Sequence, residues 1–169
     1  MIVVRAIAFV LVALALQAGI AHALPGVAHR IDALVLPVVW FAVANSQRAG
    51  MLSGCAAGLA QDAWFLAGPF GLHGFVKTFL GWVLGGIGSR VDLNTPGQRA
   101  VATVLFVLAG SILEYGLRHL LEQEGAHADP VTWAVRAVAT AILAYGTFAL
   151  FDRVRRTGGR GRGPARRGV

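Results

Sequence analysis

The sequence predicts an all-α integral membrane protein, a six-helix transmembrane bundle with both termini in the cytoplasm. Three observations lead to this prediction. First, 56% of the 169 residues are hydrophobic and only 14% are charged, whereas a soluble domain carries roughly 25% charged residues. Second, the apolar residues fall into six runs, most of them close to the length of about 20 residues that crosses a bilayer. Third, the basic residues gather on one side of the membrane that these runs define. The composition argues against both a soluble enzyme and a disordered regulator.

Six predicted spans follow one another with short connections. They are Ile2–Ala21, Asp32–Ser46, Ala49–Leu66, Gly71–Gly88, Ala100–Leu120 and Val131–Phe151. The first is an apolar run that contains Arg5 near its start. The segment Ala21-His22-Ala23 at its end has the form of a signal-peptidase site, but we expect the run to be retained as a span. The second is short and contains Pro37, which predicts a kink.

The third and fourth spans carry small residues at intervals that place them on one helix face. Glycines spaced in this way allow two helix backbones to approach closely. A short turn joins the two spans, so the sequence predicts a tight antiparallel hairpin. The residues expected to pack it are Gly50, Gly54, Gly58, Pro69, Gly71, Gly81 and Gly85. The simpler interpretation is that these glycines permit packing and do nothing more.

Charged residues within the spans fall in the outer half of the predicted bundle. Asp62 continues the glycine stripe of its helix, so we expect it to face a helix contact and to meet Lys77 across the hairpin. Glu114 and Arg118 stand four residues apart, an order that favours a salt bridge. An unpaired charge in lipid costs roughly 2.5–3.5 kcal/mol, so these side chains should face the interior. They form either an outward-facing pocket for a partner or ligand, or a set of ion pairs that locks the helices. The predicted pocket residues are Asp62, His73, Lys77, Glu114, Arg118 and Arg136.

Almost all of the formal net charge of +7 comes from the C-terminal tail, and without the tail the chain is close to neutral. Residues 1–151 should form the transmembrane domain, and residues 152–169 a flexible basic cytoplasmic tail. The tail has no aromatic residue for base stacking, so we expect no nucleic-acid partner. Cytoplasmic termini place almost all arginines inside, as the positive-inside rule requires. The arginines expected to contact anionic lipid or a cytoplasmic partner are Arg153, Arg155, Arg156, Arg160, Arg162, Arg166 and Arg167.

Sequence signals for catalysis or cofactor binding are missing. No Walker motif, H-E-x-x-H motif or nucleophile elbow occurs. The five histidines lack metal-site spacing, and the lone Cys55 lies in an apolar helix, where we expect it to pack as a small hydrophobe. We therefore expect no enzyme, no metal and no cofactor.

Two short motifs flank the turn of the predicted hairpin. They are Gly58-Leu59-Ala60-Gln61-Asp62 and Pro69-Phe70-Gly71-Leu72-His73. They resemble the bacterial rod shape-determining MreD family, whose members carry G-x-x-x-D followed by P-x-G-L. The resemblance implies a multi-pass protein of the bacterial inner membrane. It also implies a non-enzymatic scaffold of the cell-elongation complex that supports lateral peptidoglycan synthesis. The implied partners are MreC, the actin-like MreB, RodA and a class B penicillin-binding transpeptidase.

Alternative functions remain open beside the scaffold. The family is similar in fold to the S components of energy-coupling-factor transporters, six-helix bundles with an outer ligand pocket. An alternative is therefore the substrate-binding component of a small-molecule, vitamin-type transporter, which would associate with ATPase subunits. A third possibility is a small flippase or lipid-binding protein without a stable protein partner.

Overall fold

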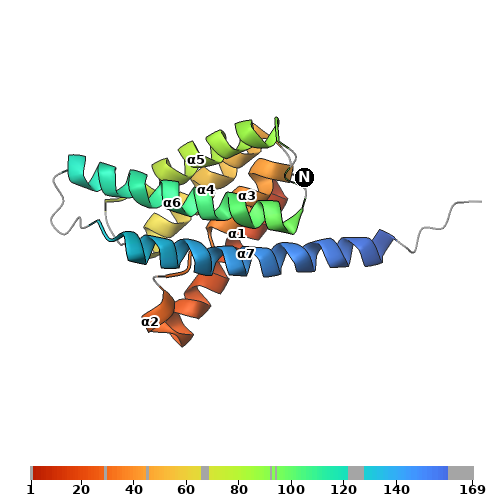
Figure 1. Cartoon of the computed structure of the whole chain (residues 1–169), viewed down its shortest axis with the longest axis horizontal. Coiled ribbons are helices and arrows are strands. Elements are labelled where there is room, and N and C mark those ends of the chain that lie inside the picture. Colours follow the sequence, from red (N-terminus) through yellow and green to blue (C-terminus); the bar gives the residue numbers. More distant parts are fainter. Residues whose placement is uncertain are drawn as a thin grey trace, which may run out of the picture.

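The computed structural model of the protein is helical. It describes residues 2–28, 30–44, 46–65, 69–91, 93, 95–121 and 128–159, and no strand occurs among them. The helices are α1 (Ile2–Ala23), α2 (Pro25–Ala28), α3 (Val35–Ala44), α4 (Gln47–Phe65), α5 (Leu72–Gly88), α6 (Pro96–Leu120) and α7 (Pro130–Gly159). The predicted all-α class is confirmed for the described part of the chain. Six helices coincide with the predicted spans, and α2 is one additional turn after the first. Figure 1 shows α2 projecting from one edge of the bundle and α7 extending beyond the other helices.

Three of these helices are long and apolar enough to cross a membrane by length and composition. The segments are Ala6–Ala23, Pro96–Leu120 and Pro130–Arg153. The ten residues of α3 measure only about 15 Å along the helix axis, against a hydrocarbon core of about 30 Å. The count of six spans and the cytoplasmic position of both termini stay predictions, and so does the likeness to S components.

The short helix α3 forms the centre of the core. Eight of its ten residues are buried, and it packs against α1, α4, α5 and α6. The kink expected at Pro37 is wrong, because Pro37 is the third residue of α3. The first-turn N–H groups of a helix have no partner within it, so a proline there costs no hydrogen bond.

Glycines bring α4 and α5 into backbone contact. A Cβ atom built on Gly54 would overlap the carbonyl oxygen of Lys77, and one on Gly58 would overlap that of His73. Gly50 and Gly81 likewise lie against each other's carbonyl oxygens. At Gly50, Gly54 and Gly58 the two helices therefore pack backbone on backbone, with no space for a side chain at these positions.

Replacing Gly54 with alanine is expected to lower the free energy of unfolding by about 1–3 kcal/mol, because the new methyl group meets backbone atoms that cannot move independently. The matched control is Gly146→Ala on α7, where a Cβ meets no atom within 4 Å and helix propensity improves. Thermal unfolding of the detergent-solubilised variants measures both effects. Equal stability of the two variants would contradict the close packing.

The C-terminal helix extends further than the sequence suggested. α7 continues through Gly159, so residues 152–159 of the expected tail are helical. This stretch has no proline and reaches its first glycine only at Gly158. Residues 160–169 lie outside the described part of the chain, and the boundary between the transmembrane domain and a basic tail stays a prediction.

A buried arginine lies at the end of the bundle where α6 begins. Arg99 directly precedes the predicted span Ala100–Leu120, so it was expected at the membrane surface, but it is 6% exposed. Its guanidinium group lies 4.8 Å from the centroid of the Trp40 ring, and its Nη1 atom lies 3.6 Å from Oδ1 of Asp152. The Nε–H group donates a hydrogen bond to the carbonyl oxygen of Leu93 at 3.2 Å. Arg99 therefore ties α6 to the core, to α7 and to the α5–α6 connection.

Candidate functional site

Asp62, near the C-terminal end of α4, binds the N-terminus of α5. Its Oδ2 atom accepts hydrogen bonds from the backbone N–H groups of Gly71 and Gly74, both at 3.0 Å. Its Oδ1 atom accepts one from the N–H of His73 at 3.3 Å and lies 2.7 Å from Nδ1 of the same residue. Gly71 has a φ of 96°, in the left-handed region that favours glycine. A carboxylate on the positive end of a helix dipole is stabilising, so Asp62 serves as a remote N-terminal cap of α5.

Lys77 lies within the bundle and pairs with Asp32. Its Nζ atom lies 2.8 Å from both carboxylate oxygens of Asp32 and also donates a hydrogen bond to Oε1 of Gln61. The side chains of Lys77 and Asp32 are 2% and 5% exposed. The expected pairing of Lys77 with Asp62 is wrong, because the Asp62 carboxylate is occupied by the N-terminus of α5. Gln61, the residue beside Asp62 on α4, faces Lys77 in its place.

Asp32 is the central acid of the site, and sequence reasoning missed it. It lies in the turn before α3, and its backbone N–H donates to Oγ1 of Thr140 on α7 at 3.1 Å. On either side, Gln17 of α1 holds the turn: its Nε2 donates to the carbonyl of Ile31 at 2.8 Å, and its Oε1 accepts from the N–H of Ala33 at 2.7 Å. The sequence did offer one signal for Asp32, because a carboxylate stands at the first position of the predicted span Asp32–Ser46.

Arg136 and Glu114 complete the site from α7 and α6. Nη2 of Arg136 lies 3.0 Å from Oδ2 of Asp32, and its Nη1 lies 3.6 Å from Oε2 of Glu114. The other oxygen of Glu114 lies 3.8 Å from Nε2 of His73. A continuous set of contacts thus joins α4, α5, α6, α7 and the turn before α3. We name it the charge network, and its members are Asp32, Gln61, Asp62, His73, Lys77, Glu114 and Arg136.

Five of the six predicted pocket residues belong to the charge network. The sixth, Arg118, lies one turn beyond Glu114 on α6, and its pairing with Glu114 stays a prediction. Four of its members, Asp32, Lys77, Glu114 and Arg136, line a cavity of only about 10 Å³, room for about one water molecule. The described residues contain no group of three His, Cys, Asp or Glu side chains that could hold a metal. The arrangement can lock the helices together. At the edge of the network, the side chains of Glu114 and Arg136 are 13% and 20% exposed.

The predicted lipid-contacting arginines are described only in part. Arg153 is exposed near the end of α7. The backbone of Arg155 and Arg156 continues the helix. Arg160, Arg162, Arg166 and Arg167 lie outside the described residues, so a contact of this group with lipid or with a cytoplasmic partner stays a prediction.

Comparison with known proteins shows what the whole chain is similar to. Among curated proteins and among solved structures, no significant match to the chain is found. The protein-family comparison does find one, and it agrees with the resemblance carried by the hairpin motifs. The family described as rod shape-determining protein MreD matches residues 1–151, which include every member of the charge network, and the chain therefore belongs to the MreD family.

Proposed function

We propose that this protein is a non-enzymatic scaffold of the cell-elongation complex that binds MreC and supports lateral peptidoglycan synthesis. The MreD family takes part in determining rod cell shape and is membrane-associated. The match to this family over residues 1–151 is the observation that carries the proposal. It extends over all seven helices except the last eight residues of α7.

The charge network supports a scaffold over a transporter component. Its groups bind one another across four helices and a turn, so it fixes the relative positions of the elements that carry it. A vitamin-type ligand needs a pocket of about 300 Å³ or more, whereas the cavity that four of its members line measures about 10 Å³. A preorganised surface costs less conformational entropy when a partner binds, and the fixed outer half would offer such a surface.

The arrangement of the proposed complex follows from the predicted topology. Six spans with both termini in the cytoplasm place the charge network in the outer half of the bilayer. MreC would contact the bundle at the edge of the network formed by Glu114 and Arg136. RodA, the class B penicillin-binding transpeptidase and MreB would join through this assembly, and the arginines from residue 153 onward would lie against anionic lipid.

Gentle extraction from the native membrane, followed by mass spectrometry of the copurified proteins, tests the scaffold proposal. We expect MreC to be recovered, together with RodA or the transpeptidase. Recovery of paired ATPases and a coupling subunit without MreC would overturn the scaffold and favour the transporter.

Substitution at the edge of the network tests the proposed contact with MreC. Replacing Glu114 with glutamine is expected to reduce MreC recovery about tenfold, because hydrogen bonds to a charged group contribute about 1.5–3 kcal/mol. The control is Ser111→Ala, one turn earlier on α6, whose hydroxyl donates only to the carbonyl of Val107. Equal recovery from both folded variants would exclude this edge as the MreC contact.

A further inference from the structure

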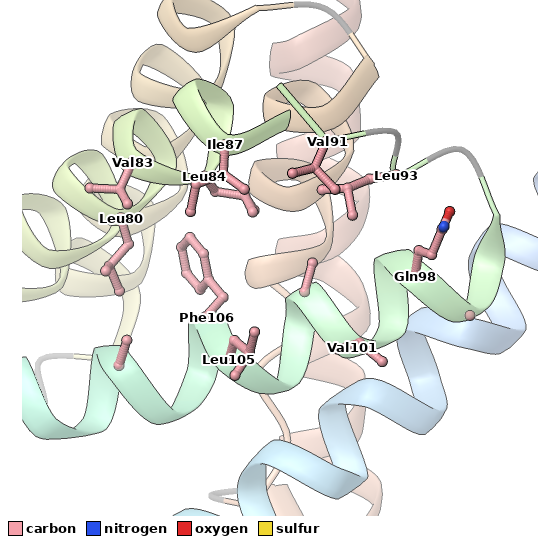
Figure 2. Close-up of a pocket in the computed structure, with 13 residues that line it drawn as sticks. Leu80, Val83, Leu84, Ile87, Val91, Leu93, Gln98, Val101, Leu105 and Phe106 are labelled. Atoms are coloured by element: carbon pink, nitrogen blue, oxygen red, sulfur yellow. The ribbon is translucent and has the colours of Figure 1, made fainter. Parts of the chain in front are cut away.

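An open apolar cleft of about 680 Å³ separates α5 from α6, away from the charge network. Figure 2 shows Leu80, Leu84 and Ile87 of α5 on one side and Leu105 and Phe106 of α6 on the other. All of the residues that line this cleft are apolar or glycine, with the exception of Gln98. We name it the α5–α6 cleft.

The length of the α5–α6 cleft corresponds to one leaflet of a bilayer. On α6 its lining extends from Gly97 to Ala109, about 18 Å along the helix axis, and one leaflet contributes about 15 Å of hydrocarbon. A second cleft of about 430 Å³ continues beyond Leu80 and Ala109, and its lining has no polar side chain. The α5–α6 cleft therefore differs from its neighbour by ending at polar groups.

Hydrogen-bond donors and positive charge lie at that end. Arg90 is exposed and directly precedes Val91, which lines the cleft. Asp92 follows Val91 in the sequence and lies outside the described residues. Oε1 of Gln98 accepts a hydrogen bond from the N–H of Thr95 at 3.1 Å, and its Nε2 donates to no group in the described part of the chain. Figure 2 shows Gln98 at one end of the row of apolar side chains. The positive end of the α6 dipole lies at the same place, so the described groups at the mouth, which are Arg90, Gln98 and the first turn of α6, suit an anion.

The wall at this end of the cleft is held in place from within the bundle. Leu93, which lines the cleft, accepts the hydrogen bond from buried Arg99, and Arg99 in turn pairs with Asp152. Leu93 is thereby tied to α6 and, through Arg99, to α7. The cleft is accordingly formed in advance of binding, and this lowers the entropic cost of ordering a flexible hydrocarbon chain.

We propose that the α5–α6 cleft binds an anionic phospholipid, with an acyl chain along α5 and α6 and the phosphate group at Arg90 and Gln98. The lipid belongs to the leaflet on the side of the α5–α6 connection, which is cytoplasmic in the topology proposed above. Charge complementarity favours this occupant over a transmembrane helix. A single-span partner carries an excess of basic residues on its cytoplasmic side, and Arg90 would repel them. The site is separate from the proposed MreC contact and does not depend on it.

Native mass spectrometry of the full chain, equilibrated with equal amounts of phosphatidylglycerol and phosphatidylcholine in detergent, tests the proposal. We expect at least one retained phosphatidylglycerol. Arg90→Gln should weaken its retention about fivefold. Ala109→Phe fills the cleft from α6 and should abolish the retention of phosphatidylglycerol. If this variant does not assemble, Val83→Phe fills the cleft from α5 and replaces it in the test. The matched control is Val138→Phe on α7, a position that is 54% exposed and is not one of the residues that line the cleft.

Two results would overturn the lipid site. One is that the cleft-filling variants retain as much phosphatidylglycerol as Val138→Phe does. Equal retention would mean that the lipid binds all around the protein and not in the cleft. The other comes from a photocrosslinking amino acid at position 105 in growing cells. A lipid adduct is the expected product, and a stoichiometric adduct with a membrane protein would show that a transmembrane helix occupies the cleft.

Discussion

Replacing Asp32 with asparagine is expected to destabilise the folded protein by about 3–5 kcal/mol, the range for breaking one partner of a buried ion pair. Asp32 is bound by both Lys77 and Arg136, so the substitution leaves two cations without their shared anion. The Lys77 side chain is 2% exposed and cannot regain hydration without opening the bundle. The free energy of unfolding, measured in mild detergent, reports the loss.

A double-mutant cycle separates the ion pair from the shape of its residues. Lys77→Met should cost less than Asp32→Asn, because Arg136 still neutralises Asp32. The double variant Asp32→Asn/Lys77→Met should be more stable than additivity predicts by at least about 1 kcal/mol, a coupling typical of residues in contact. The control Arg48→Met changes an exposed cation on α4 and should stay within about 0.5 kcal/mol of the parent. Additive costs would show that Asp32 and Lys77 do not stabilise each other.

Much of the helical framework could be predicted because its signals are local. Apolar run length gave the approximate positions of the helices, although α7 continued past the expected end. The four-residue spacing of Gly50, Gly54 and Gly58 defines a helix face without knowledge of the partner helix. The same spacing placed Asp62 on the α4 face that meets α5, where it contacts Gly74 and His73.

The pairing of charges could not be predicted, because it depends on how whole helices are rotated and placed. The predicted spans put Asp62 and Lys77 in the same outer half of the bundle, but depth in the membrane leaves the rotation of each helix undefined. Asp32 lies 45 residues from Lys77 and 104 from Arg136 along the chain. Its position depends on the hydrogen bond that its backbone N–H donates to Thr140 and on those that Gln17 makes with Ile31 and Ala33, and neither Gln17 nor Thr140 carries a charge. Arg99 was expected at the membrane surface for a related reason: aromatic side chains from α3 and α7 bury it.

Replacing Asp62 with alanine is expected to destabilise the protein by at least about 3 kcal/mol, because several buried donors at the start of α5 lose their acceptor. Asp62→Asn should cost less than Asp62→Ala, because the asparagine side chain keeps one acceptor oxygen. It should still be less stable than the parent, because its NH2 group faces the other backbone donors. Gly71→Ala should cost about 1–2 kcal/mol through the left-handed backbone at that position. The control is Asp129→Asn, an exposed N-terminal cap of α7, where asparagine caps equally well. Thermal unfolding and circular dichroism of each variant provide the comparison.

The effect of Asp62→Asn on MreC binding shows whether Asp62 is a structural cap of α5 or a residue that contacts the partner. The Asp62 side chain is 3% exposed, so a partner cannot reach it in the folded protein. We therefore expect MreC recovery to decrease only in proportion to the unfolded fraction, and a lower growth temperature should restore both together. A folded Asp62→Asn variant that no longer retains MreC would contradict this expectation. It would require α4 and α5 to separate at their turn when the partner binds, which the backbone contacts at Gly54 and Gly58 oppose.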